Sequence, residues 1–373
     1  MTTPRIGVVG TGWWATNAHL PALAANPRAE LAAVCDVDGD RARSAAAEFG
    51  AGRAVTDVSE LAGVCDAVIV ATPHHSHHDI AIAAVQAGLH VLVEKPLATT
   101  GADAWDLVRT ARQAGLYLSM GYTYQYADAA HFVRETVAGG EIGELVQVSV
   151  EFASGTVSLF AAADAGADPA DPHVPHPGTY SSANGGGQAH TQITHVIGMV
   201  CWATGKEVEE VFAYVDRGAL SVDVTDAACF RMRGGGLGVC GSSGMAGAGG
   251  ARHYVRYLGT RGLVEQDLLA GSAVLATPDG HRIYRGPAAA DPAYPTWWVS
   301  RDFVELVAGR GPDHAPGWYG AAAASFCEAL LQSGSSHRPE SVTAAPLPPP
   351  AARAGIPPGV ATRDAARTGN REN

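Results

Sequence analysis

The sequence predicts an α/β fold in which an N-terminal doubly wound parallel sheet is followed by a C-terminal α+β domain with a large, mostly antiparallel open sheet. Two patterns predict it. In the first third of the chain, short β-branched apolar runs alternate with longer Ala-rich helical stretches, an order typical of a parallel sheet with right-handed crossovers. After about residue 143, strand-like runs follow one another through Gly-rich turns, and helical stretches interrupt and close them.

The expected elements follow in chain order. The parallel strands cover residues 5–9, 31–35, 67–71 and 90–93, and the helices cover 14–25, 39–49, 78–87 and 102–114. The second sheet is expected at 145–152, 208–215, 227–233, 237–243, 252–259 and 263–267, with helices at 187–202, 300–309 and 319–332. These elements predict a first domain at residues 1–122 and a second at 123–341. Residues 342–373 are rich in Pro and Gly and poor in large apolar side chains, which predicts a disordered tail.

The composition excludes several classes of partner. The chain has 373 residues, with 25 Lys and Arg against 37 Asp and Glu, so its formal charge is −12. Because no basic run is present, we expect neither nucleic acid nor an anionic membrane surface as a partner. The apolar runs are far shorter than the roughly 18 residues that span a bilayer, and the N-terminus has no signal-peptide pattern. Six widely spaced cysteines without a C-x-x-C pair predict free thiols, and together these features predict a cytoplasmic protein.

A glycine-rich turn stands between the first expected strand and the first expected helix. Residues 10–15 read G-x-G-x-x-A, in which Gly10 permits a tight turn and Gly12 lets a pyrophosphate approach the backbone. The small Ala15 allows the helix to pack closely on the strand. Free N–H groups at the start of that helix favour phosphate binding. The turn therefore predicts that the first domain is a Rossmann domain that binds a dinucleotide.

An acidic residue, Asp36, follows the second expected strand at the spacing of a ribose-binding acid. Its carboxylate would accept hydrogen bonds from the ribose hydroxyls of an adenosine and repel a 2′-phosphate, which favours NAD over NADP even though Arg41 and Arg43 lie nearby. The alternative is that Asp36 caps the helix that begins at Gly39.

Two further motifs follow the next two strands, at the sheet edge where ligands bind. Thr72 and Pro73 open a loop that holds four histidines, of which His77 is expected to line the nicotinamide end. A metal site is not expected, because neighbouring side chains in such a loop diverge and no acidic or thiol partner completes a ligand set. In the second motif, Glu94-Lys95-Pro96, the proline is expected to hold Lys95 extended and aim its amine into the cleft. A surface ion pair between Lys95 and Glu94 is the alternative.

Together these pieces resemble the glucose-fructose oxidoreductase / inositol dehydrogenase (Gfo/Idh/MocA) family over about residues 5–334. Further landmarks are Gly121-Tyr122, the GEIGE sequence at 140–144, the three glycines at 185–187 and the LGTRG sequence at 258–262. The resemblance implies a Rossmann domain joined to an α+β domain whose open sheet mediates oligomerisation, so a homo-oligomer (dimer or tetramer) is expected. The expected cofactor-binding residues are Gly10, Thr11, Gly12, Trp13, Trp14, Asp36, Thr72, Pro73, His77, Glu94 and Lys95.

The expected catalytic residues besides Lys95 come from the helix after the three glycines. In the family, an acid and a histidine four residues apart project toward the lysine, and the histidine takes the hydroxyl proton. His195 matches that histidine, whereas the acid position is occupied by Thr191, which departs from the family pattern. Without the resemblance, a lone histidine on an apolar helix would more often be a core residue. The resemblance implies that His195 and Lys95 are catalytic and that Thr191 hydrogen-bonds the substrate or a water.

The substrate is expected to be a sugar, amino sugar or cyclitol. The family often has Asn and Arg after the glycine that corresponds to Gly121, whereas this chain has a tyrosine-rich segment at 122–126, which argues against a carboxylate or phosphate handle. Tyr122, Tyr124 and Tyr180 are the expected substrate-binding residues besides Lys95, Thr191 and His195. Interdomain packing is the alternative for the tyrosines at 122–126. The segment 155–184 is expected to form a pocket wall or a partly mobile loop.

The sequence therefore predicts an NAD-dependent dehydrogenase that oxidises a secondary hydroxyl to a ketone, or runs the reverse reduction, with Lys95 polarising the oxygen and His195 moving the proton. Two alternatives stay open. One is an NAD-dependent glycosidase that oxidises its substrate only transiently, and the other is a dinucleotide-binding regulator without enzymatic activity.

Overall fold

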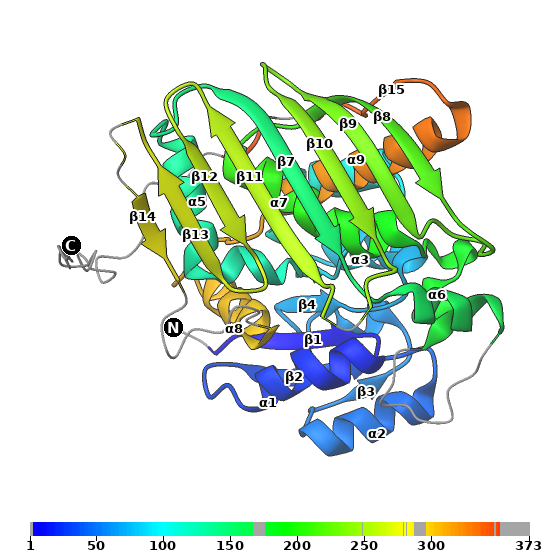
Figure 1. Cartoon of the computed structure of the whole chain (residues 1–373). Coiled ribbons are helices and arrows are strands. Elements are labelled where there is room, and N and C mark those ends of the chain that lie inside the picture. Colours follow the sequence, from blue (N-terminus) through cyan, green and yellow to red (C-terminus); the bar gives the residue numbers. More distant parts are fainter. Residues whose placement is uncertain are drawn as a thin grey trace.

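The computed structural model describes residues 3–166, 176–247, 249–278, 280, 282–286, 296–346 and 348–350. Its two halves are stacked, as Figure 1 shows: the first half lies below in blue, and a broad sheet in green and yellow lies above it. This arrangement confirms the predicted α/β fold with a parallel sheet followed by a mostly antiparallel one.

The lower sheet has six parallel strands in the order β3-β2-β1-β4-β5-β6. They are β1 (Arg5–Val9), β2 (Glu30–Cys35), β3 (Ala54–Val55), β4 (Ala67–Val70), β5 (His90–Val93) and β6 (Leu118–Met120). The strand order reverses between β1 and β4, and this is the place where doubly wound sheets bind ligands at the carboxyl ends of their strands. The four strands expected from the sequence are present, whereas β3 and β6 were not expected because they are too short to give a periodic pattern.

The helices of the first half are α1 (Leu20–Ala24), α2 (Gly39–Phe49), α3 (His77–Gln86) and α4 (Gly101–Ala114). The expected single helix at 14–25 is instead a π-helical turn η1 (Ala15–His19) followed by α1. The side chain of Asp38 caps α2 by accepting from the N–H groups of Asp40 and Arg41. The alternative assignment of Asp36 as that cap is therefore wrong.

The upper sheet has nine strands in the order β14-β13-β12-β11-β7-β10-β9-β8-β15. They are β7 (Leu145–Ala153), β8 (Val208–Asp216), β9 (Thr225–Met232), β10 (Leu237–Ser243), β11 (Arg252–Gly259), β12 (Leu263–Asp267), β13 (Ser272–Ala276), β14 (Arg282–Arg285) and β15 (Glu340–Ser341). All pairs are antiparallel except the central pair β7 and β10, which is parallel.

Helices cover one face of the upper sheet and leave the other open. The covering helices are α5 (Asp128–Ala138), α7 (Thr194–Thr204) and α9 (Gly317–Ser336), and a short helix α6 (Val157–Asp164) lies beside the sheet. Helix α8 (Thr296–Val307) packs on η1 and α1 of the lower half, and α9 also contacts α4. Helix α8, which the sequence places in the second domain, thus also packs on the Rossmann half.

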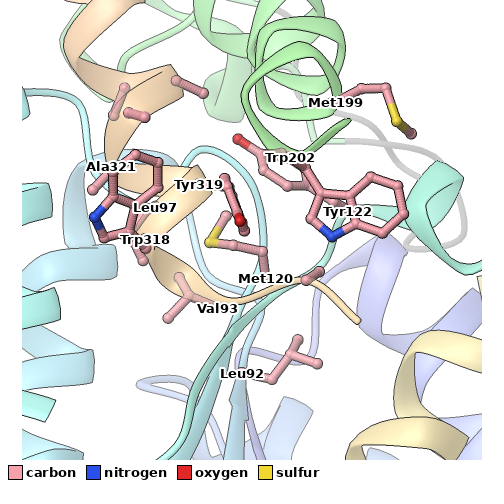
Figure 2. Packing of buried hydrophobic residues seen from close by; sticks show 14 of the residues in the cluster. Leu92, Val93, Leu97, Met120, Tyr122, Met199, Trp202, Trp318, Tyr319 and Ala321 are labelled. Carbon is pink, nitrogen blue, oxygen red and sulfur yellow. The ribbon is translucent and has the colours of Figure 1, made fainter. Parts of the chain in front are cut away.

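One hydrophobic core runs through both halves. Figure 2 shows Met120 of the lower sheet beside Tyr319 of α9, with Trp202 of α7 nearby and Leu92 farther below. These side chains are buried and belong to one connected cluster. The end of β5 and the helix α7 are therefore held in a fixed relation by packing.

The disordered tail expected from residue 342 onward does not begin there, because the first residues of that segment contact the fold. Val342 is buried and donates its backbone N–H to the Glu209 carbonyl at 3.0 Å. The backbone N–H of Ala345 donates to the Glu207 carboxylate, and Thr343 accepts from the indole of Trp105. Residues 342–345 are thus docked on the fold, and the expected disorder of 351–373 lies outside the described residues.

No helix in the described ranges has the length and apolarity that a membrane crossing requires. The cytoplasmic location stays a prediction.

Candidate active site

A cavity of about 1140 Å³ lies between the carboxyl ends of the parallel strands and the inner face of the upper sheet. The following expected site residues lie on its wall: Gly10, Gly12, Trp13, Trp14, Asp36, Thr72, Pro73, His77, Glu94, Lys95, Tyr124, Tyr180, Thr191 and His195. The structure thus brings together residues that the sequence places far apart. Thr11 and Tyr122 are the two expected residues that do not lie on this wall.

The glycine turn has the shape that a pyrophosphate requires. Gly10 has φ +89°, and a Cβ at that position would lie 2.7 Å from the carbonyl oxygen of Ala71. Apart from its own chain neighbours, no described residue comes within 4 Å of the place where Gly12 would carry a Cβ, so the backbone there faces open space. Both glycines border the cavity at the start of η1, and these features fit the phosphates of a dinucleotide.

Asp36 is held at the mouth of the same cavity. One carboxylate oxygen accepts from the backbone N–H and the hydroxyl of Thr11 at 2.8 and 2.7 Å, and the other accepts from the N–H of Asp38 at 3.0 Å. Thr11 therefore positions Asp36. Arg41 donates to the Thr11 carbonyl at 3.1 Å, so the nearby guanidinium is bound to the glycine turn. A carboxylate fixed at this place fits the ribose hydroxyls of NAD.

Three of the four histidines of the 72–78 loop, His74, His77 and His78, have separate partners. Nδ1 of His77 lies 2.7 Å from the carbonyl oxygen of Pro96, and its Nε2 lies 2.8 Å from the carbonyl oxygen of Thr72. The ring is fully buried. His74 contacts the Gly185 carbonyl at 2.9 Å, and His78 contacts two surface carboxylates. His77 therefore ties the loop to the Lys95 segment. No cluster of three metal-binding side chains occurs among the described residues.

Lys95 extends into the cavity from the end of β5. Its Nζ donates to the backbone carbonyl of Thr191 at 3.3 Å, so the lysine reaches the second half of the molecule. Burial lowers the pKa of Lys95, and the charge of Glu94 opposes that shift. Glu94 is only 7% exposed, and its carboxylate accepts from Trp14, His19 and the backbone N–H of Lys95. The alternative of a surface ion pair is therefore wrong.

Thr191 and His195 both lie on the wall, but the backbone between them differs from the expected single α-helix. Residues Ala189–Ile193 form a π-helical turn η7, and α7 begins at Thr194. Such turns often occur at functional sites. Burial lowers the pKa of His195 well below 6.5, and the charges of Lys95 and His253 act in the same direction. His195 is therefore a neutral imidazole near neutral pH.

The tyrosines divide between the cavity and the core. Tyr122 is buried behind the wall, where its hydroxyl hydrogen-bonds Thr194 at 2.8 Å, so the expected substrate contact through Tyr122 is not supported and the packing alternative holds for it. Tyr124 lies on the wall, with its ring centroid 5.9 Å from that of His195. Its hydroxyl lies 2.6 Å from Nδ1 of His253.

Two wall residues, Phe152 and His253, were missed by the sequence analysis. Their rings stack at 3.7 Å across the paired strands β7 and β11. The signal was the alternation in β11, where His253 shares the inward face with Val255 and Tyr257.

Comparison with known proteins agrees with this architecture. Residues 4–122 match the family model "Oxidoreductase family, NAD-binding Rossmann fold", and residues 131–265 match the "GFO/IDH/MocA C-terminal domain". The chain is 32% identical over 148 residues to glucose-6-phosphate 3-dehydrogenase of Bacillus subtilis, which is 40% of this chain and 42% of that protein. It is 29% identical over 286 residues to myo-inositol 2-dehydrogenase of Thermotoga maritima, covering 74% of this chain and 78% of that one. The match thus spans about two fifths of the length of the Bacillus subtilis protein and about three quarters of the length of the Thermotoga maritima protein.

Solved structures show the same fold. GenD2 from gentamicin A biosynthesis in complex with NAD has a TM-score of 0.72 at 26% identity, covering 92% of this chain and 97% of that one. Levoglucosan dehydrogenase in complex with NADH and levoglucosan has a TM-score of 0.76 at 21% identity, covering 91% and 100%. With an NAD-binding Rossmann domain and the matching C-terminal domain in one chain, this protein belongs to the Gfo/Idh/MocA family of oxidoreductases.

Proposed function

We propose that this protein is an NAD-dependent dehydrogenase that oxidises a secondary hydroxyl of a sugar, amino sugar or cyclitol to a ketone, or runs the reverse reduction. The observation that carries the proposal is the single cavity that holds the dinucleotide-binding turn, Lys95 and His195. The names of the relatives, which are sugar and inositol dehydrogenases, support the same class of reaction.

The residues divide the chemistry between them. Lys95 donates a hydrogen bond to the substrate oxygen and stabilises negative charge on it, since its ammonium is the charged group that reaches the far wall. His195 accepts the hydroxyl proton, because its neutral ring has a free basic nitrogen near neutral pH. NAD, when bound, would supply the acceptor for the hydride of the carbon that carries this hydroxyl. Thr191 holds Lys95 through its backbone carbonyl.

The wall that the second half contributes favours an uncharged substrate. Among its described residues, none is Asp, Glu, Lys or Arg. The wall offers hydroxyl, amide and imidazole groups beside the rings of Tyr124 and Phe152. Aromatic faces pack on the C–H patches of a sugar ring, and the polar groups match its hydroxyls. A neutral polyol therefore fits this wall better than a sugar phosphate or a protonated amino sugar.

The direct test is NADH formation on a panel of polyols, amino sugars and glycosides, with two catalytic variants. His195→Ala is expected to lower kcat by about 10²- to 10⁴-fold and to leave NAD binding intact, because the proton acceptor is lost. Lys95→Met is expected to have an effect of the same order. The matched controls are His78→Ala, at the start of α3, and Lys206→Met, whose amine donates, within the part of the chain that the structure describes, to the loop carbonyls of Gly234 and Gly235. Unchanged turnover in His195→Ala, or glycoside cleavage without net NADH, would contradict the proposal.

The preference for NAD over NADP is a second part of the proposal and depends on Asp36. Asp36→Ala is expected to raise the KM for NAD roughly tenfold or more, since a charge-assisted hydrogen bond is lost, and to improve the use of NADP. Asp40→Ala, on the outer side of α2, is the matched control. Steady-state kinetics with both cofactors measure the effect, and a wild type that prefers NADP would overturn the assignment.

We also propose that the protein is a homo-oligomer that pairs through the open face of the upper sheet. Several large apolar side chains, among them Tyr214, Leu237 and Val239, are exposed over β8 and β10. Apolar surface of this kind on a soluble protein commonly marks an interface.

The oligomer is tested by light scattering during size-exclusion chromatography. Val239→Lys is expected to reduce the mass toward that of one chain, because a charge would be buried in the interface. Gln113→Lys, on an exposed position of α4, is the control. A wild-type mass of one chain, or an unchanged oligomer in Val239→Lys, would exclude this face.

A further inference from the structure

Glu94 lies immediately before the proposed catalytic lysine, and three parts of the chain hold its carboxylate. Oε1 accepts from the indole N–H of Trp14 at 2.9 Å and contacts Nε2 of His19 at 3.1 Å. Oε2 accepts from the backbone N–H of Lys95 at 3.2 Å. A Cβ on Gly121 would lie 2.1 Å from Oε1, so only glycine leaves room for the carboxylate. The side chain is therefore fixed at both oxygens.

A second buried contact supports His19 from behind. Its Nδ1 lies 2.8 Å from the hydroxyl of Ser300, which comes from α8. His19 is 1% exposed and Ser300 is 0% exposed. The hydrogen-bonded row Ser300–His19–Glu94 thus links α8, η1 and the residue just after β5, and its two contacts join residues far apart in the sequence.

The protons between His19 and Glu94 have one consistent arrangement. Burial acts to raise the pKa of Glu94, but the hydrogen bond and charge of His19, the charge of Lys95 and the bond from Trp14 outweigh it, so the pKa is lowered. An ionised carboxylate only accepts hydrogen bonds, so Nε2 of His19 carries the proton. Nδ1 of the same ring is held by the Ser300 hydroxyl, which can act as donor or acceptor. Ser300 therefore fixes the orientation of the ring that donates to Glu94.

A serine, a histidine and a carboxylate in a row also occur in enzymes with a serine nucleophile. Here that role is excluded by burial, because neither Ser300 nor His19 borders the cavity, and Ser300 has no exposed surface. The row of hydrogen bonds from Ser300 through His19 ends at the carboxylate of Glu94, directly before Lys95. This location indicates that the row supports Lys95.

We propose that Ser300 and His19 are positioning residues that keep Glu94 ionised and in place, and thereby hold Lys95 in its working position and charge state. This inference rests on the proposed function for its catalytic consequence. Fixing a reactive group through a buried hydrogen-bonded neighbour is a general way to pre-organise a site. Helix α8, from the C-terminal part of the chain, would thus contribute to a site whose wall it does not touch.

Several other titratable groups lie around Glu94 and Lys95 and contribute to the electrostatic environment of these two residues. Those acting on or beside Glu94 are His19, His77, Tyr122 and Tyr126, and those beside Lys95 are His74, His77 and His195. The variants chosen for the test leave all of these in place except His19.

The chain offers a direct measurement, because it has lysine at only two positions, Lys95 and Lys206. Competitive acetylation with acetic anhydride across the neutral and alkaline range, read by mass spectrometry, gives the apparent pKa of Lys95 with Lys206 as internal reference. His19→Leu removes the donor to Glu94, so the carboxyl becomes easier to protonate and supports the ammonium less. The apparent pKa of Lys95 is therefore expected to fall in this variant.

In the same variant, kcat is expected to fall roughly 10- to 100-fold with a smaller change in the KM for NAD, because the lysine is misplaced and the cofactor turn is intact. His19→Gln keeps an N–H donor directed at Glu94 and is expected to restore both readouts toward the wild type. Ser300→Ala, which loses only a hydroxyl, is expected to change them in the same direction by a smaller factor.

Ser325→Ala is the matched control, since its buried hydroxyl donates to the Ala321 carbonyl within α9 and to no other group among the described residues. If Ser300→Ala and His19→Leu match this control in Lys95 pKa and kcat, the proposal is overturned. Should His19→Leu fail to fold, Ser300→Ala decides alone. The acetylation needs no substrate. If the variants lower the apparent pKa of Lys95 but the wild type is inactive on every polyol, the positioning role of Ser300 and His19 is supported while the proposed reaction is refuted.

Discussion

The packing of α9 on β6, and of α7 on α9 and on Tyr122 just after β6, is the constraint on which the site depends. Met120 and Leu92 of the lower sheet share one core with Trp202 and Tyr319 of the upper half. Because interiors of this kind are close-packed and deform little, the strand end that carries Lys95 has a fixed position relative to the helix that carries His195. The hydrogen bond from Lys95 to the Thr191 carbonyl is a consequence of that packing.

The same arrangement sets the charge states that the chemistry requires. Burial shifts the pKa values of Lys95 and His195 downward, and each group's charge is further opposed or supported by its neighbours. The charge of Glu94 favours the ammonium of Lys95. His195 is surrounded by the rings of Tyr122, Tyr124 and Phe152, and burial and the charges of Lys95 and His253 lower its pKa. In the proposed reaction, Lys95 acts as the cationic donor and His195 as the neutral acceptor within one cavity. A hydroxyl group placed between them meets one donor and one acceptor.

Sequence patterns predicted those parts of the fold that have a local signal. The β-branched runs marked the long strands, and the glycine turn, Asp36 and the Glu94-Lys95-Pro96 motif marked one edge of the cavity. Helix α5 and strands β13 and β14 were missed, and the π-helical turns at Ala15–His19 and Ala189–Ile193 have no periodic pattern that distinguishes them from α-helix. The contacts of His253 with Tyr124 and of Ser300 with His19 join residues far apart in the sequence, so only the folded chain reveals them.

The central claim is that a neutral His195 takes the proton while a cationic Lys95 holds the oxygen. The pH dependence of kcat/KM for polyol oxidation by the wild-type enzyme tests it most directly. Because the pKa of His195 is lowered from 6.5, the rate should decline on the acid side only below the range of an ordinary histidine. Because the pKa of Lys95 is lowered from 10.5, the decline on the alkaline side should begin below the range of an ordinary lysine. An acid limb at or above 6.5, or an alkaline limb at or above 10.5, would contradict the account.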